Sequence, residues 1–218
     1  MTVNTMINNT RQHSLYLHPY TNQSGAVMAI SLIMLLLLTL IGVTGSQVTG
    51  LEEKMAGNMK DRNIAFQAAE SALRDAVQDI QVRASGISNF FVNCNMDNIA
   101  NTADDGLCDR KWGSPGYTEP TYARTSISWP AFTDAGNNYP AITLDMTTTP
   151  SVAYGSFTGA TPIAGLSAQP RYIIEGDQAP RTGSDSTQAI YFYRITARAQ
   201  GANPNTVVWL QTIIFVIP

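Results

Sequence analysis

The sequence is poor in charge, histidine and cysteine. Charged residues make up 13% of the 218 residues, about half the usual share in globular proteins. The formal net charge of -3 provides no basic surface for a polyanion, so a nucleic-acid partner is not expected. Both histidines, His13 and His18, lie near the N-terminus, which excludes histidine-dependent nucleophilic and metal sites from nearly the whole chain. Two cysteines without histidine cannot complete a four-ligand zinc site, and neither an enzyme activity nor a cofactor is predicted.

A long uncharged segment is the first strong feature. No charged residue occurs between Arg11 and Glu52, and residues 26–44 read AVMAISLIMLLLLTLIGVT. A membrane-spanning helix needs about 20 such residues. A buried core helix is one alternative, but the unbroken LIMLLLL run has no polar face. A secretory signal peptide is the other, but it has a shorter apolar core, a basic start and a cleavage site after the core. We expect residues 26–45 to cross a membrane.

The charges that flank this segment and the two cysteines favour opposite orientations of the segment in the membrane. Arg11 lies on its N-terminal side, whereas Lys54, Lys60 and Arg62 lie on its C-terminal side. The positive-inside rule therefore mildly favours a cytoplasmic C-terminal part. The pair of cysteines instead indicates an oxidising compartment on that side. The sequence leaves this conflict open.

A helical pattern continues through residues 46–86. Apolar residues recur there at spacings of mostly three and four, namely Val48, Leu51, Met55, Met59, Phe66, Ala69, Leu73, Ala76, Ile80 and Ala84. The charged residues off this stripe, including Asp61, Asp75 and Asp79, are predicted to face solvent, and Ser85-Gly86 supplies a stop. With the apolar segment, this pattern predicts one helix of about 60 residues.

Alternating strand patterns occupy residues 171–218. Residues 191–200 read YFYRITARAQ, which is typical of a half-buried strand with one apolar and one polar face. The sequence GANPN at 201–205 is a turn, residues 206–217 form a second strand, and residues 171–175 form a third. A helix with one apolar stripe and a sheet with one apolar face each need a partner. We therefore predict an α+β fold in which the long helix packs on a small antiparallel sheet.

Residues 87–170 are rich in Asn, Thr, Gly, Ser and Pro and poor in charge. We predict a loop-rich variable region with one or two short strands, for example at residues 125–129. Its aromatic side chains either form a contact face or pack in the core, and core packing is favoured; they are Tyr117, Tyr122, Trp129, Phe132, Tyr139, Tyr154 and Phe157.

Cys94 and Cys108 enclose a loop within this region. A disulfide closing a loop of this size would stabilise the fold by about 3 kcal/mol in the chain-entropy model; free structural thiols are the alternative. Several residues of the loop faintly resemble a calcium-binding loop, namely Asn101, Asp104, Asp105, Gly106 and Asp109. The EF-hand spacing, however, needs an acid where Trp112 stands. A glycine-containing turn with solvated acids is favoured, and no metal site is predicted.

Three segments resemble the PilX-type minor pilins of type IV pili. They read QSGAVMAISLIMLLLLTLIGV, then EEKMAGNMKDRNIAFQAAESAL, then YRITARAQG followed by VVWLQTIIF. The stretch from Ala56 to Leu73 is the most specific part. The resemblance covers residues 26–85 well and residues 171–217 more loosely, and it leaves the middle of the chain unmatched.

The resemblance implies a pilin-like fold and a sequence of processing and assembly steps. A prepilin leader, residues 1–25, would be cut between Gly25 and Ala26 by a prepilin peptidase, and the new N-terminus methylated. The helix would anchor the subunit in the bacterial inner membrane, with the C-terminal domain in the periplasm, before the subunit becomes extracellular in the pilus. Partners would be other minor pilins, the major pilin and a pilus-tip adhesin. The residues expected to pack in the helix bundle or filament are Ile30, Leu51, Met55, Phe66 and Leu73.

Two departures from most pilins bear on the role. Most pilins carry a glutamate at the fifth mature position, where this chain has Ile30, which cannot pair with a neighbour's amino terminus. This suits a subunit that primes assembly and stays at or near the tip, supporting pilus biogenesis, twitching motility and adhesion. The leader is also longer and less basic than usual, with Arg11 as its only charged residue.

Two other functions remain as alternatives. A GspK-like minor pseudopilin of a type II secretion system has the same architecture, although such proteins tend to carry a larger inserted domain. A membrane-anchored periplasmic enzyme or binding domain would need a pocket with converging polar groups. Nothing in the sequence picks out such groups, and Lys111 and the few acids have no visible partners.

Overall fold

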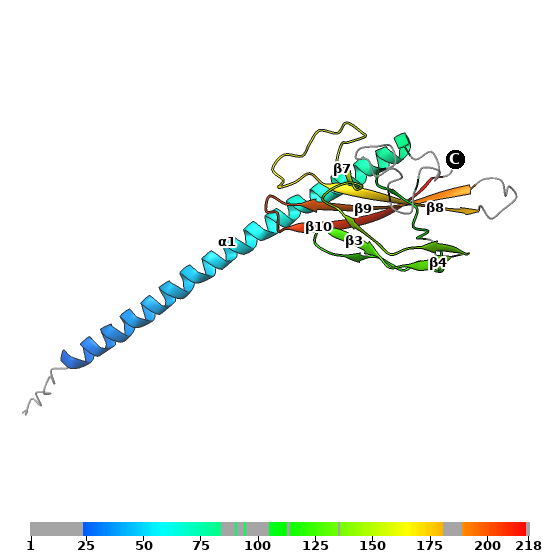
Figure 1. Ribbon diagram of the computed structural model, residues 1–218. Coiled ribbons are helices and arrows are strands. Elements are labelled where there is room, and N and C mark those ends of the chain that lie inside the picture. The colour runs from blue at the N-terminus through cyan, green and yellow to red at the C-terminus, as the bar shows by residue number, and fades with distance from the viewer. Residues whose placement is uncertain are drawn as a thin grey trace, which may run out of the picture. The chain divides into compact units, whose positions relative to one another are not determined.

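The computed structural model of the chain describes residues 24–83, 90, 94, 105–112, 114–134, 136–180 and 189–216. Helix α1 (Ser24–Arg83) is followed in these ranges by strands β1 (Leu107–Cys108), β2 (Thr121–Tyr122), β3 (Ser126–Trp129), β4 (Phe132–Asp134), β5 (Asn137–Tyr139), β6 (Ile142–Asp145), β7 (Val152–Ala153), β8 (Arg171–Pro180), β9 (Ala189–Gln200) and β10 (Val207–Val216). The contacts divide the chain into two units, Met1–Glu52 and Glu53–Pro218. The predicted α+β class is confirmed (Figure 1).

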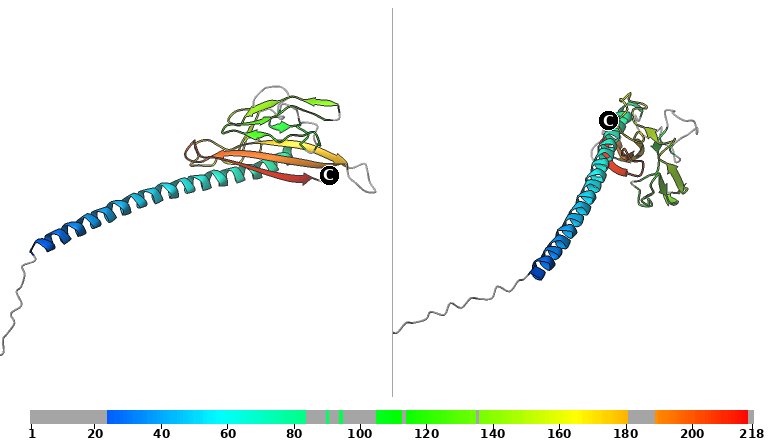
Figure 2. Two further views of the ribbon diagram at one scale, coloured as in Figure 1. Left: turned by 90° about the horizontal axis from the view of Figure 1, so that it is seen from below. Right: turned by 90° about the vertical axis from the view of Figure 1, so that its left-hand side faces the viewer.

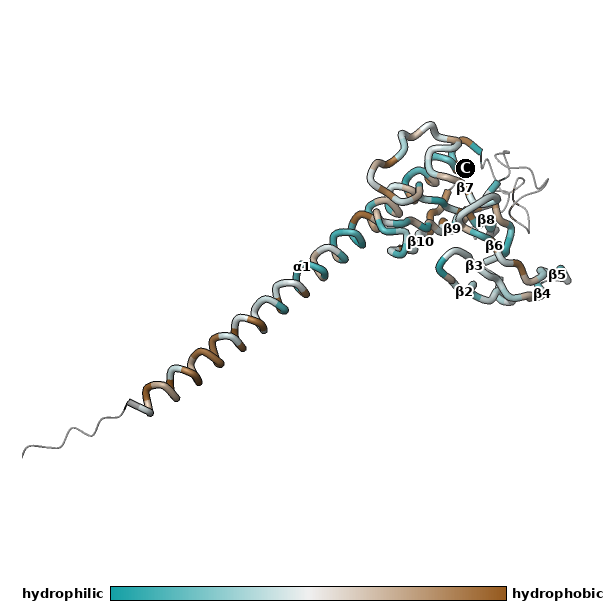
Figure 3. Tube along the Cα trace, turned by 60° about the vertical axis from the view of Figure 1, so that its left-hand side comes forward, coloured by the Kyte–Doolittle hydropathy of each residue, from teal (hydrophilic) through white to brown (hydrophobic). Residues whose placement is uncertain are grey.

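Helix α1 is continuous over 60 residues, as the sequence predicts. Its first half is mostly apolar (Figure 3), and the described side chains there are exposed. By length and composition, α1 is able to cross a membrane. The predicted stop at Ser85-Gly86, like Ala84, lies outside the described residues.

The central sheet has the order β1-β8-β9-β10, and β7 also pairs with β8. Strands β8, β9 and β10 are antiparallel, with Arg171 opposite Arg198 and Val207 opposite Gln200. Strand β1 is parallel to β8. The three predicted C-terminal strands are therefore present, and β8 continues to Pro180, beyond the predicted end at Glu175.

Small residues join the second half of α1 to one face of this sheet. Fully or almost fully buried along the helix are Ala65, Ala68, Ala69, Ala72, Ala76 and Ile80. Alanines keep the helix close to the sheet, where Ala72, Ala76 and Ile80 form one core cluster with Tyr172, Ile174, Tyr193, Ile195 and Ala197. The predicted stripe was therefore not buried along its whole length. Met55, Met59 and Phe66, in its N-terminal part, are 60%, 68% and 47% exposed. Only the C-terminal part of the stripe is covered by the protein's own sheet.

The other face of the sheet is also covered. Figure 2 shows the central sheet between the second half of α1 and the green strands of the middle region. Ile127, Trp129, Leu144 and Met146 form a second core cluster with Ile173. Strand β9 was predicted to be half-buried, yet Arg194, Thr196 and Arg198 on its polar face are also buried. The prediction was wrong because the region treated as loop-rich supplies a second layer.

That second layer is built from very short strands. Strands β2, β3 and β6 form one sheet, and β4 and β5 form a separate pair. Strand β3 coincides with the strand predicted near residues 125–129. Trp129, Phe132 and Tyr139 are buried, as core packing predicts, and the Phe132 and Tyr139 rings stack at 4.7 Å. Tyr122 is partly exposed and contacts Trp209, with ring centroids 5.3 Å apart.

Candidate functional site

The largest uncovered apolar surface of the described chain follows α1. Large aliphatic side chains from Val27 to Met59 are all exposed. A contiguous surface of this length needs lipid or another protein to cover it. Gly25 and Ala26, the residues of the predicted cleavage site, lie in the first turn of α1 and are exposed.

The five predicted packing residues do not form one cluster. Ile30, Leu51, Met55 and Phe66 are exposed along α1, so they are available to a partner outside the chain. Leu73 is instead partly buried against the protein's own core. The assignment of the first four to filament packing stays a proposal.

Two acidic side chains predicted to face solvent are buried and attach α1 to the sheet domain. The Asp79 carboxylate accepts a hydrogen bond from the Tyr172 hydroxyl at 2.9 Å and pairs with the Arg83 guanidinium one turn later. Burial, with the Asp79 charge, raises the pKa of Tyr172, so the phenol stays neutral and donates. Asp75 accepts hydrogen bonds from the Gly155 amide at 2.7 Å and from the Thr158 hydroxyl.

Asp61 makes a third attachment. Its Oδ1 accepts hydrogen bonds from the Ala202 amide at 2.7 Å and the Asn203 amide at 3.3 Å, in the turn between β9 and β10. The Thr206 hydroxyl and, to a lesser extent, these two amides lower the pKa of Asp61, against an opposing effect of burial. A side chain at Gly201 would collide with the Asp61 carboxylate, at 2.4 Å from its Oδ1. The glycine of the predicted GANPN turn therefore lets the helix approach the turn.

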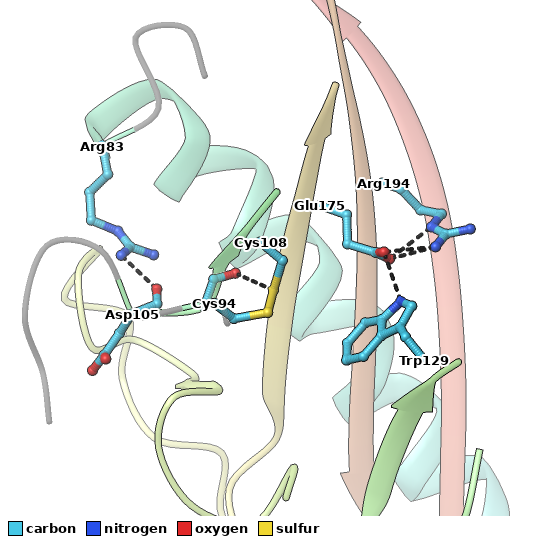
Figure 4. Close-up of a disulfide and its surroundings, with 8 residues drawn as sticks. Arg83, Cys94, Asp105, Cys108, Trp129, Glu175 and Arg194 are labelled. Carbon is cyan, nitrogen blue, oxygen red and sulfur yellow. Dashed lines mark hydrogen bonds and ion pairs between the residues drawn. A yellow bond between two sulfur atoms is a disulfide. The ribbon is translucent and has the colours of Figure 1, made fainter. Parts of the chain in front are cut away.

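Cys94 and Cys108 form a disulfide, the pairing that the sequence favours over free thiols (Figure 4). The Gly106 amide donates to the Cys94 carbonyl at 3.0 Å. Because Cys108 belongs to β1, which pairs with β8, the bridge ties the Cys94 segment to the central sheet. Arg83 donates to the Asp105 carbonyl at 2.9 Å, which links α1 to the same loop.

The calcium interpretation gains no support from the described part of this loop. Asp105 is buried, and Gly106 has a positive φ of 72°, as expected for a tight glycine turn. Within the described ranges no group of three or more potential acidic, cysteine or histidine ligands could hold a metal ion. Residues 101–104 lie outside the described residues. Lys111 has acidic neighbours after all, Asp109 at 3.3 Å and Asp177 at 4.0 Å.

A buried ionic cluster between the two layers was not predicted. Glu175 and Arg194 are opposite each other in β8 and β9, and the guanidinium donates two hydrogen bonds of 2.8 Å to the carboxylate. The Trp129 indole N–H adds a third at 3.1 Å (Figure 4). Glu119 contacts Arg194 at 3.0 Å. The sequence shows an acid in the strand at residues 171–175 and a base in the strand at residues 191–200. It does not show that the two residues are opposite each other, because the register between the strands is set by the tertiary structure.

This cluster is a structural ion pair. Burial by itself raises the pKa of Glu175, whereas Arg194 and the Trp129 indole favour its carboxylate form. Burial likewise lowers the pKa of Arg194, but the Glu175 carboxylate outweighs it and the net shift is upward. Given the two-pronged geometry, we infer that both groups are charged. The carboxylate is fully buried and bonded to three donors, so it is not placed to take a proton from a substrate.

A long helix with an exposed apolar half, whose other half packs through alanines on an antiparallel sheet, defines a pilin-like subunit. The chain belongs to the PilX family of type IV pilus assembly proteins. The family described as "Type IV pilus assembly protein PilX C-term" matches residues 94–216, and "PilX N-terminal" matches residues 24–74. No curated protein and no solved structure matches the chain.

Membership of this family confirms the resemblance derived from the sequence. The chain is a type IV pilus minor pilin, and its family consists of structural pilus components rather than known enzymes. The match to pilus assembly also favours a pilus over the type II secretion alternative. The family match reaches back to Cys94, so it includes most of the middle region that the sequence resemblance left unmatched.

Proposed function

We propose that this minor pilin helps prime assembly of a type IV pilus in the inner membrane and then sits at or near the filament tip. The observation that carries the proposal is the exposed apolar half of α1. It has no charged residue before Glu52, and the fifth position after the proposed cut is the exposed Ile30. Without a carboxylate there, the subunit has no charge with which to pair to the amino terminus of a subunit already in place.

Assembly by this route exchanges one apolar environment for another. Lipid covers the first half of α1 before assembly, and the helices of neighbouring subunits cover it afterwards. Lipid tails are about as apolar as aliphatic side chains, so close packing rather than hydrophobic burial drives this step. No chemical reaction of the subunit is needed beyond its processing by the prepilin peptidase.

We also propose an orientation for the C-terminal domain. The disulfide between Cys94 and Cys108 suits an oxidising compartment, which favours the periplasm and then the cell exterior. There the domain would meet other minor pilins, the major pilin and a tip adhesin. Through these contacts the subunit would support pilus biogenesis, twitching motility and adhesion.

Intact mass tests the processing step. The chain is isolated from membranes of cells with and without an active prepilin peptidase. We expect a loss matching Met1 to Gly25 and the gain of one methyl group only with the active peptidase. A Gly25→Leu variant serves as the control that stays uncut. A chain that keeps Met1 beside the active enzyme would make α1 a plain anchor and overturn this part of the proposal.

Filament counts and immunogold labelling test the role in assembly. Loss of the chain is expected to lower the number of pili per cell at least tenfold, and the intact chain is expected to restore it. A chain with Leu35→Arg in the apolar half should not restore pili, whereas the exposed control Asn63→Ala should. Label along the whole shaft would contradict the tip position, and normal piliation without the chain would contradict the priming role.

A further inference from the structure

Two arginines lie opposite each other in β8 and β9. Arg171 and Arg198 are register partners, just as Glu175 and Arg194 are further along the same two strands. Because side chains alternate along a strand, all four point to the face that is covered by the second layer. The Glu175–Arg194 pair compensates its charges, whereas like charges directly opposite each other destabilise a sheet. The Arg171–Arg198 pair therefore needs negative charge from another source.

The hydrogen bonds of these two arginines go to uncharged acceptors. Arg198 is 4% exposed, and its Nη2 has no hydrogen-bond partner. Its Nε donates to the Arg124 carbonyl at 2.8 Å. Arg171 donates to the Ser151 hydroxyl at 2.7 Å and to the Ser151 carbonyl. Over the described ranges neither arginine forms an ion pair within 4.0 Å, although buried arginines are almost always paired.

Positive charge is in excess where Arg124, Arg171 and Arg198 meet, a place that we call the arginine corner. Burial lowers the pKa of Arg198, the Asp145 carboxylate opposes this effect, and the charge of Arg124 adds to it. Burial also lowers the pKa of Arg171, against the charges of Asp105 and Asp145. Asp145 acts on both buried arginines, but its side chain is exposed. An exposed acid at such a distance compensates a buried charge only weakly.

The arginine corner is reached from the surface at Arg124. This residue is exposed and lies in the turn between β2 and β3. Its guanidinium donates to the Pro204 carbonyl at 2.9 Å and to the side-chain oxygen of Asn205, both in the β9–β10 turn. Because Arg198 bonds the Arg124 carbonyl, the buried guanidinium lies directly beneath the exposed turn. An anionic group at this turn would contact one guanidinium and lie next to the other.

We propose that the arginine corner binds a carboxylate on an acidic segment of a partner protein. The carboxylate would replace the uncharged acceptors of Arg124 and accept a hydrogen bond from Nη2 of Arg198. Arginine suits this task because its planar guanidinium matches the two oxygens of a carboxylate. Asp145 repels a doubly charged phosphate more strongly than a singly charged carboxylate, which favours the carboxylate. The site goes beyond the proposed function, because it does not depend on where the subunit lies in a pilus.

Peptide binding to the full-length chain in detergent tests this site. The probe is fluorescein-labelled hexaglutamate, and its affinity is measured by fluorescence anisotropy at constant ionic strength. Arg124→Gln removes an exposed charge of the corner and is expected to weaken binding at least tenfold. The matched control Arg74→Gln removes another exposed arginine, which pairs with Glu70 on α1, and should change the affinity less than twofold. Absence of binding, or equal losses in the two variants, overturns the proposal.

A gain of affinity separates a binding role from a structural one. Asp145→Asn removes the negative charge from the corner and retains an oxygen for the Thr147 amide and hydroxyl, which both donate to Asp145 Oδ1. We expect the peptide to bind at least threefold more tightly to this variant. Asp134→Asn in β4 is the control and should leave the affinity unchanged. Unchanged or weaker binding to Asp145→Asn contradicts the proposal.

The buried arginine gives an independent readout. Arg198→Met is expected to weaken binding at least tenfold. Without peptide it should not lower the melting temperature, because an apolar side chain replaces an unpaired buried charge. Peptide should raise the melting temperature of the native chain only, and a rise that persists in Arg198→Met overturns the proposal.

Inorganic phosphate tests the chemical class of the ligand. Phosphate at matched ionic strength should not displace the peptide, because Asp145 disfavours a second negative charge. Displacement by phosphate would overturn the carboxylate assignment. Failure of any of these binding tests is distinct from failure of the proposed function, because a chain that is cut and needed for pili but binds no acidic peptide contradicts only the site.

Discussion

Asp79 of α1 accepts a hydrogen bond of 2.9 Å from the hydroxyl of Tyr172 in β8, 93 residues further along the chain. Both side chains are fully buried, so the bond joins the helix to the middle of the sheet where water cannot replace it. Asp79 also neutralises the Arg83 guanidinium, which lies over the Phe157 ring at 3.7 Å. One carboxylate thus connects the helix, the sheet and the loop before β8.

Removing this carboxylate should be costly. Asp79→Leu removes the buried carboxylate that pairs with Arg83 and accepts from Tyr172, and we expect the free energy of unfolding to fall by about 3–5 kcal/mol. Tyr172→Phe removes only the hydroxyl and should cost about 1–3 kcal/mol. Urea unfolding of the full-length chain in detergent, followed by tryptophan fluorescence, measures both. A loss for Asp79→Leu no larger than that for Tyr172→Phe would show that the ion pair contributes little.

The disulfide should contribute independently of the ion pairs. Replacing Cys94 and Cys108 by serine is expected to lower the free energy of unfolding by about 3 kcal/mol, the chain-entropy value for a loop of this length. The same unfolding experiment with and without a reducing agent checks this. The reductant should destabilise the native chain and leave the double variant unchanged. An equal response of both proteins would contradict the prediction.

Asp61 should make stability depend on pH in the acid range. Its pKa is lowered from the ordinary value of 3.8 in the folded protein, so the unfolded chain takes up the proton first as the pH falls. The stabilisation is therefore complete above about pH 5 and is lost as the pH drops through 3.8 towards the folded-state pKa. We expect Asp61→Asn to melt at a lower temperature than the native chain at pH 6. Below the folded-state pKa of Asp61 the two melting temperatures should converge.

Asn63→Asp provides the control for this pH experiment, because Asn63 is exposed on the same helix and is not among the residues that line the depression beside the β9–β10 turn. Thermal melts of all three proteins between pH 2.5 and pH 6 give the comparison. A difference between Asp61→Asn and the native chain that stays constant across this range would contradict a lowered pKa.

The Glu175–Arg194 pair should show strong coupling. Arg194→Met leaves the buried Glu175 carboxylate without its guanidinium and is expected to lower the free energy of unfolding by about 3–5 kcal/mol. Adding Glu175→Leu should recover part of that loss. A double-mutant cycle on the free energies of unfolding measures the interaction. Trp129→Phe removes the indole donor at 3.1 Å together with part of a fully buried ring, so it should also lower the free energy of unfolding. Additive single losses would mean that the two charges do not depend on each other.

Local patterns in the sequence were enough to predict the main helix and strands of this protein. The uncharged run from residue 26 and the three-and-four spacing beyond it predicted one helix of about 60 residues, and the alternation at 191–200 predicted β9. These features depend on neighbours along the chain, where side-chain periodicity directly reports the element. The motifs from Ala56 to Leu73 also indicated the family.

Partners on distant segments could not be predicted in this way. Asp75 and Asp79 fall on the polar side of the apparent stripe, and only their contacts with Gly155, Thr158 and Tyr172 show that this side of the helix is buried. Arg194 likewise looked solvent-facing, because nothing local shows that the middle region folds over β9. The Glu175–Arg194 pair depends on strand register, which is set by the whole sheet.

The sequence by itself therefore determined the long apolar helix and the C-terminal strands, because each is encoded in residue periodicity and composition over short stretches. The pilin class followed from the resemblance of three segments to PilX-type sequences. Tertiary structure alone decided which flank of α1 meets the sheet. The alanine face from Ala65 to Ala76 allows the closest approach and places the aspartates against their donors. The larger residues Met55, Met59 and Phe66 are left exposed on the adjacent flank, because no strand in the described part of the chain covers them.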